Sequence, residues 1–129
     1  MRDYEFRGRT SEDSKYPNRW YYGSLVTCTD SDDVMIVIAF DDNNRITRHV
    51  DPKTVGQFTG LVDKYGIKIY EGDIIRWIKG KKRKTENDEW EDDYEIIRVE
   101  WNGAGFNIAH LKDVTDSIDV VGNIYKNYK

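Results

Sequence analysis

The chain has 129 residues, 38% of them hydrophobic, and its four Trp, nine Tyr and four Phe exclude a disordered protein. This length suits one domain with a core of its own. The formal net charge of −4 excludes a protein that holds nucleic acid over its whole surface, and it is too small for a DNA mimic.

Turn-forming residues recur along the chain at the spacing that is typical of all-β folds. Residues 4–7 alternate apolar and charged side chains and predict a half-buried strand. The polar residues 10–18 predict a loop. Residues 19–27 predict a second extended segment with a bend at Gly23.

A hairpin is predicted over residues 34–50. Its first strand is the uninterrupted apolar run 34–40, whose length and β-branching favour a buried strand over a helix. The polar residues 41–44 supply the turn, and residues 45–50 alternate again. Pro52 ends the second strand, and residues 52–55 form at most one helical turn.

Gly60, Gly66 and Gly72 follow one another at a six-residue spacing, and we interpret them as turn and bend positions. Residues 63–66 predict a type I turn in which Gly66 is left-handed, so that residues 58–61 pair with residues 67–70. Residues 71–73 predict a second tight turn. Bends or close backbone approaches are expected at Gly56 and Gly60, and a ligand contact by Gln57, Thr59 or Asp73 is the alternative reading of the same pattern.

The C-terminal third predicts strands at residues 74–78, 94–101, 106–109 and 118–125. Asn102 and Gly103 are a strong hairpin signal, and residues 79–93 predict a long charged loop. This layout is similar to a small SH3-like barrel, an analogy that carries no functional weight. The expected fold is all-β, with antiparallel hairpins, a barrel-like C-terminal region and at most short helical turns. We expect one domain of residues 1–129, divisible into an N-terminal β region of residues 1–54 and a barrel-like region of residues 55–129.

The charged loop carries the one basic patch that suggests nucleic acid, because clustered cations contact phosphates and nearby tryptophans stack on unpaired bases. The candidate cations are Lys79, Lys81, Lys82, Arg83 and Lys84. The candidate stacking residues are Trp77, Trp90 and Trp101. Six carboxylates follow immediately and are expected to pair loosely with these cations across a hairpin and to weaken the patch; they are Glu86, Asp88, Glu89, Glu91, Asp92 and Asp93.

Residues that commonly perform catalysis or bind metals are few and scattered. Cys28, His49 and His110 show no paired ligand spacing, so no zinc site or nucleophile is expected. Oxygen-rich turns at residues 30–33 and 41–44 lack the glycine and glutamate of an EF-hand. A hydrolase that pairs Asp63 with Asp73 needs a cleft that brings these groups together. We expect no cofactor and no metal.

The cellular compartment is expected to be the cytoplasm. One cysteine cannot form an internal disulfide, which favours a reducing environment. Apolar runs fall short of the ~18 residues of a spanning helix, and residues 1–7 lack the apolar segment of a signal peptide. A soluble protein without a membrane association is the expectation.

Three blocks of the chain resemble the YopX family of bacteriophage and prophage proteins. They are residues 55–75, the ending 120–127, and the opening 6–8 together with 20–25. The chain departs from the family pattern at Tyr65-Gly66 and Ile67-Lys68. The resemblance implies a predominantly β fold and a phage or prophage origin, and it supplies no active-site residues. We assign a structural role to its signature residues Gly56, Gly60, Gly66, Gly72, Asp73 and Gly122.

The sequence therefore predicts a non-enzymatic phage or prophage accessory protein that acts through protein–protein association in the host cytoplasm. The partner is a host protein, a phage protein or a second copy of the chain. An exposed strip of Trp20, Tyr21 and Tyr22 is one candidate for this interface. The alternative function is a nucleic-acid-binding small β-barrel that uses residues 79–84.

Overall fold

The computed structural model describes residues 5–27, 33–40, 45–83 and 89–125. Nine strands are found in these segments of the chain, together with three single-turn 3-10 helices, and every strand pair with a recorded register is antiparallel. The predicted mainly β fold is thus confirmed. The chain divides into two compact units, Met1–Phe58 and Thr59–Lys129, and the boundary falls inside one strand, β5.

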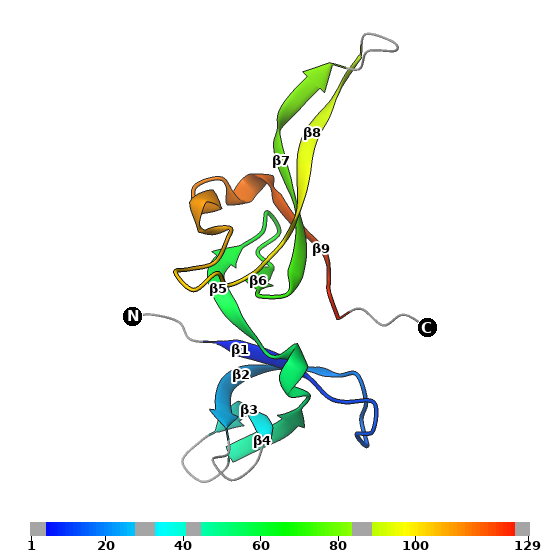
Figure 1. The fold of residues 1–129 in the computed structure, drawn as a ribbon, viewed down its shortest axis with the longest axis vertical. Coiled ribbons are helices and arrows are strands. Elements are labelled where there is room, and N and C mark those ends of the chain that lie inside the picture. Colours follow the sequence, from blue (N-terminus) through cyan, green and yellow to red (C-terminus); the bar gives the residue numbers. More distant parts are fainter. Residues whose placement is uncertain (1–4, 28–32, 41–44, 84–88, 126–129) are drawn as a thin grey trace. The chain divides into compact units, whose positions relative to one another are not determined.

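The first unit is a sheet with the strand order β4-β3-β2-β1-β5 (Figure 1). The predicted hairpin is confirmed, since β3 and β4 pair from Val34↔Val50 onward, while its turn 41–44 lies outside the described residues. The predicted helical turn after Pro52 is also confirmed. The bounds are β1 Phe6–Arg9, β2 Trp20–Thr27, β3 Val34–Phe40, β4 Arg45–Val50, η1 Pro52–Thr54 and β5 Gly56–Val62.

A small core and two backbone-capping threonines hold the first unit together. Ile36 is fully buried. Gly8 lies so close to Val50 that a Cβ there would come within 2.6 Å of Val50 Cγ2. Thr54 Oγ1 accepts a hydrogen bond from the Arg9 backbone N–H at 2.8 Å. Thr10 closes the predicted loop, because its Oγ1 accepts a hydrogen bond from the Arg19 backbone N–H at 2.9 Å and donates one to the Tyr16 carbonyl at 2.6 Å.

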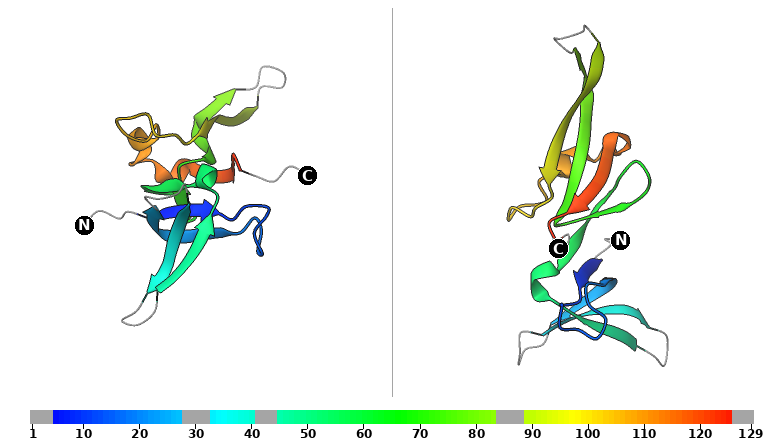
Figure 2. Two further views of the ribbon diagram at one scale, coloured as in Figure 1. Left: turned by 60° about the horizontal axis from the view of Figure 1, so that its bottom comes forward. Right: turned by 90° about the vertical axis from the view of Figure 1, so that its right-hand side faces the viewer.

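The second unit contains the end of β5, the strands β6 to β9 and two short helices. The end of β5 pairs with β6, and β8, β7 and β9 form a separate sheet in that order. Views from two further directions show the long strands β7 and β8 extending beyond β9 (Figure 2). The bounds are β6 Lys68–Tyr70, β7 Asp73–Arg83, β8 Trp90–Arg98, η2 Ala109–Leu111, η3 Thr115–Ser117 and β9 Ile118–Asn123.

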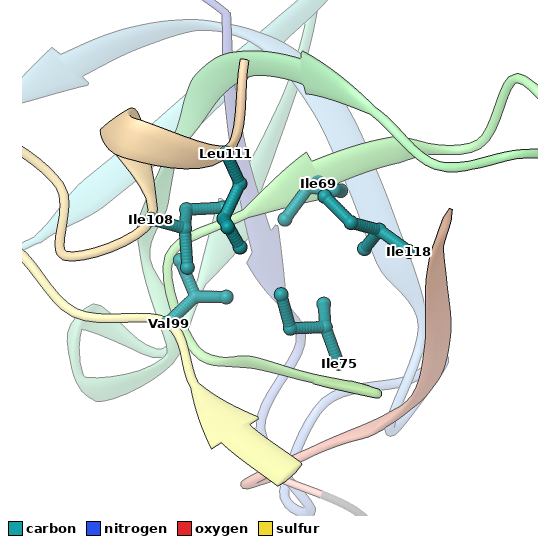
Figure 3. Close-up of a cluster of buried hydrophobic side chains, with 6 residues drawn as sticks. All are labelled: Ile69, Ile75, Val99, Ile108, Leu111 and Ile118. Carbon is teal, nitrogen blue, oxygen red and sulfur yellow. The ribbon is translucent and has the colours of Figure 1, made fainter. Parts of the chain in front are cut away.

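Six aliphatic side chains with at most 1% exposure form the core of the second unit (Figure 3). Burying each of them contributes about 1.5–3 kcal/mol relative to exposure. They come from β6, β7, β9, η2 and the segments just after β8 and just before η2. The residues are Ile69, Ile75, Val99, Ile108, Leu111 and Ile118.

Two details of the predicted C-terminal region are wrong or unconfirmed. Residues 106–109 do not form a strand, because only Phe106 bridges to Trp101 and the chain then turns into η2, which brings Leu111 into the core. The Asn102 turn itself is present, with its N–H donating to the Gly105 carbonyl at 3.0 Å. The SH3-like barrel is not confirmed, since the strands of the described residues form no closed barrel.

The predicted loop at residues 79–93 is also wrong, because strand pairing continues into it. β7 runs on to Arg83 and β8 begins at Trp90. A register shift between Ile78 and Gly80 makes Lys79 an extra, bulged residue. Since β9 pairs with β7 only as far as Trp77, residues 78–83 and 90–94 form a two-stranded ribbon, which projects beyond β9 (Figure 1).

Candidate functional site

The turn at residues 63–66 is built around the buried carboxylate of Asp63. Its Oδ1 accepts hydrogen bonds from the backbone N–H groups of Tyr65 at 2.8 Å and Ile67 at 2.9 Å. Its Oδ2 accepts a third from Val120 at 3.2 Å. Gly66 has φ +80°, so the predicted left-handed glycine turn is confirmed. Asp63 therefore closes the turn and also fastens β9 to it.

The second turn joins two of the blocks that resemble the family signature. Gly72 has φ +93°, and a Cβ there would lie 2.8 Å from Cε2 of the Tyr125 ring. The Gly72 carbonyl accepts from the Ile124 N–H at 2.9 Å, and Asp73 is paired with Asn123. Asp73 Oδ2 also accepts from the Tyr70 N–H at 2.8 Å. Residues 70–73 and 123–125 thus form one packed corner.

The remaining signature residues lie in strand positions. Gly56 is paired with Arg7, Gly122 with Ile74, and Gly60 lies inside β5. Thr59 Oγ1 donates to the Ile69 carbonyl at 2.8 Å, which ties β5 to β6. The described contacts of Asp63 and Asp73 serve turns, and the hydrolase interpretation finds no support in them. A ligand contact by Gln57, Thr59 or Asp73 stays a prediction.

The scattered histidines occupy unrelated places. His110 lies in η2, with its ring edge-on to Trp77 at 6.0 Å between centroids. His49 lines a shallow cavity of about 480 Å³ in the first unit, together with Asp13, Asp33 and Asp51. Among the described residues no group of three or more His, Cys, Asp or Glu can hold a metal ion. Cys28 and the turn residues 30–32 and 41–44 lie outside the described residues.

The predicted aromatic strip at residues 20–22 is split between two faces of β2, because successive side chains of a strand alternate. Trp20 lies 4.6 Å from the guanidinium of the buried Arg7. Tyr21 lies 5.8 Å from the Arg48 guanidinium. Tyr22 is 44% exposed. The three rings therefore do not form one continuous surface.

The outer face of the β8-β7-β9 sheet is the most exposed apolar surface built on regular structure in the described segments. Directly paired residues in antiparallel strands share a face, and Ile75 with Ile97 marks the side toward the core. The opposite side, which we call the outer face, carries Trp90, Tyr94 and Ile96. These side chains are 65%, 54% and 55% exposed. Three large apolar groups of one strand are thus presented together.

Cations flank these apolar groups on the outer face. Arg83 lies 5.9 Å from the Trp90 ring and Arg76 lies 6.0 Å from the Tyr94 ring. Lys81 pairs with Asp92, Arg76 with Asp119 and Arg98 with Glu100, at 3.0, 3.0 and 3.2 Å. The cations of the outer face are therefore Arg76, Lys81, Arg83 and Arg98.

The structure divides the predicted basic patch. Lys81 and Arg83 belong to the outer face. Lys82 lies across from Glu91 on the opposite side of the ribbon, and Lys79 is the bulged residue. Lys84 lies outside the described residues. Sequence reasoning missed Arg76 and Arg98, which lie outside the basic run. Reading residues 74–78 and 90–98 as two alternating strands would have found them, since both residues lie outside the bulge at Lys79.

The candidate tryptophans are likewise separated. Trp77 packs against the core of the second unit. Trp101 is 51% exposed and contacts Phe106 edge-to-face, with ring centroids 5.0 Å apart. Of the three, Trp90 is the one on the ribbon's outer face. The side of the ribbon opposite the outer face instead carries the carboxylates Glu91 and Asp93.

Comparison with known proteins gives one family. The family model described as "YopX protein" matches residues 5–129. None of the curated proteins matches the chain. Among the helices in the described ranges, none is both long and apolar enough to cross a membrane.

Proposed function

The chain belongs to the YopX family, and on that premise we propose that it is a non-enzymatic accessory protein of a bacteriophage or prophage. It acts in the cytoplasm of the bacterial host by associating with another protein of the phage or the host. The outer face of the β8-β7-β9 sheet is the contact surface.

The observation that carries this proposal is the exposure of Trp90, Tyr94 and Ile96 on one face of β8. Trp and Tyr are enriched among the residues that dominate binding energy in protein interfaces. A paired strand holds them in fixed positions, so little conformational entropy is lost on binding. Arginines beside the rings add a polar, charged rim of the kind found around apolar interface centres.

The test compares two variants that each remove exposed apolar groups from the second unit. Replacing Trp90, Tyr94 and Ile96 by Thr removes the apolar groups of the outer face but keeps β-forming residues in β8. The matched control replaces Tyr65 and Ile67 by Thr; these side chains are 70% and 54% exposed in the turn of the same unit. A partner is first identified by cross-linking in host cells, then purified, and its affinity is measured for each variant.

The proposal predicts that the triple variant loses at least tenfold in affinity while the Tyr65/Ile67 variant binds like the wild type, because truncating hot-spot residues costs about 2–4 kcal/mol and tenfold corresponds to about 1.4 kcal/mol. Unchanged affinity in the triple variant contradicts the proposed surface. A strictly monomeric protein without any cross-linked partner contradicts association altogether.

A second candidate function is binding of single-stranded nucleic acid on the same face. It is favoured by one observation: the outer face carries four cations, of which Arg83 and Arg76 lie beside the rings of Trp90 and Tyr94, although Asp92, Asp119 and Glu100 pair with Lys81, Arg76 and Arg98. Aromatic stacking contributes about 1–3 kcal/mol per base. This function predicts salt-dependent binding of a single-stranded oligonucleotide that is lost when Arg76, Lys81, Arg83 and Arg98 are replaced by Gln.

A further inference from the structure

We propose that the open edge of β8 accepts an extended, lysine- or arginine-rich segment of the partner protein, which adds to the β8-β7-β9 sheet as a fourth strand. This inference rests on the proposed function, since it names the chemistry of the partner. Strand addition of this kind gains affinity from main-chain hydrogen bonds and specificity from alternate side chains.

The edge of β8 has the backbone groups that such a strand needs. The strand order β8-β7-β9 places β8 at the border of the sheet. For residues 91–97 the structure records no hydrogen bond between their backbone and any described segment other than β7. The open part of the edge ends at Arg98, because the Arg98 carbonyl already accepts a hydrogen bond from Asn107 Nδ2 at 2.8 Å. The open stretch matches the length of an ordinary strand.

The charges of β8 select a basic partner. Asp92 is paired with Lys81 at 3.0 Å, and Glu91 lies directly across from Lys82. Asp93 and Glu95, in contrast, lie across from Gly80 and Trp77, so β7 places no cation directly opposite them. Both point to the side opposite the outer face. Opposite charges directly across two strands attract, and their side chains are within reach.

The two sides of β8 together define the pattern of the incoming strand. One side presents Asp93 and Glu95, and the other presents Trp90, Tyr94 and Ile96, with Asp92 between Trp90 and Tyr94 paired to Lys81. Because side chains alternate between the two sides of a strand, the complementary segment has cations at every second position and apolar residues between them. The proposed partner segment is thus an alternating basic and apolar sequence.

A second copy of this chain is disfavoured at the edge in the registers centred on Tyr94 and on Asp93. Antiparallel pairing of two β8 strands about Tyr94 sets Asp93 across from Glu95 twice. Pairing about Asp93 sets Glu91 across from Glu95 and Asp93 across from itself. Like charges directly opposite each other destabilise a strand pair. Carboxylates on an edge also deter aggregation, and the experiment separates that protective role from recognition.

The probe is a blocked peptide of alternating Lys and Val, about eight residues long to match a strand. Its controls are a peptide with the same composition in which all Lys precede all Val, and an alternating Glu and Val peptide. Binding to the full chain is measured by calorimetry and by tryptophan fluorescence. Amide hydrogen exchange then reports whether the N–H groups of residues 91–97 that face away from β7 become protected.

The inference predicts that the alternating basic peptide binds, that the block and acidic peptides bind much more weakly, and that the edge amides of β8 gain protection. Replacing Asp93 by Asn and Glu95 by Gln weakens binding roughly tenfold, because two cross-strand charge pairs are lost. The matched control replaces Asp113 and Asp116, both exposed in the same unit, by Asn. This control retains the wild-type affinity.

The inference is overturned by equal binding of the block peptide, by binding without amide protection, or by unchanged affinity of an Asp93/Glu95 variant that circular dichroism shows to be folded. An oligonucleotide that protects the same amides while the peptide does not also overturns it. The proposed function fails separately, when the Trp90/Tyr94/Ile96 variant keeps its purified partner. Loss of that partner together with absent peptide binding rejects the strand addition alone.

Discussion

Replacing Gly72 by Ala is expected to destabilise the protein more than replacing Gly66 by Ala, although both glycines are left-handed. At Gly66 the added Cβ meets nothing within 4 Å, so the cost is backbone strain. That strain of roughly 1–2 kcal/mol is partly offset by the stiffer unfolded chain, which leaves a loss of about 1 kcal/mol. At Gly72 the Cβ also meets the Tyr125 ring at 2.8 Å.

The contact with Tyr125 adds the cost of overpacking, about 1–3 kcal/mol, so Gly72→Ala is expected to lose about 2–4 kcal/mol of unfolding free energy in total. The assay is urea denaturation followed by tryptophan fluorescence and near-UV circular dichroism. A double-mutant cycle isolates the ring contact: in a Tyr125→Ala background, the cost of Gly72→Ala falls to that of Gly66→Ala. Equal losses for the two glycines in the wild-type background refute the reasoning.

Two further predictions concern the second unit. Asp63→Ala leaves three backbone N–H groups without their acceptor and is expected to cost about 2–4 kcal/mol of unfolding free energy. Asp63→Asn keeps an acceptor oxygen and is expected to cost less. Equal losses for the two variants contradict the turn-closing role of Asp63. Ile75→Ala creates a cavity and is expected to cost about 2–5 kcal/mol, whereas Ile96→Ala on the outer face changes the unfolding free energy by about 0.5 kcal/mol or less. Both pairs are measured by urea denaturation, and a larger loss at Ile96 contradicts the assignment of the two faces.

The sequence was sufficient to predict those structural features that depend on residues close together in the chain. The strand formed by the apolar run 34–40 and the left-handed Gly66 are examples, because strand propensity and the φ +80° turn depend on residues adjacent in the chain. Asp63 shows the limit of this reasoning. Its bonds to Tyr65 and Ile67 follow from turn chemistry, but its bond to Val120 joins residues 57 positions apart and has no local signal.

The candidate surface was not predictable from local patterns for a specific geometric reason. The outer face of β7 carries Arg76 and Ile78 at even positions, but Lys81 and Arg83 at odd positions beyond the bulge. A regular two-residue period read through this segment therefore assigns the wrong side to Lys81, Lys82 and Arg83. High charge also concealed the strand, since the described residues of β7 beyond Ile78 are charged or glycine and lack the apolar alternation that marks a strand.

Because the ribbon projects beyond β9, its residues lie apart from the buried residues that stabilise the second unit. Substitutions among Ile69, Ile75 and Ile118 alter the stability of the fold, whereas the described ribbon residues lie outside that buried cluster. On the proposed function, the ribbon is an exchangeable recognition element: its composition can diverge among members of the family and acquire new specificities, while the packed corner of residues 70–73 and 123–125 is left unaltered.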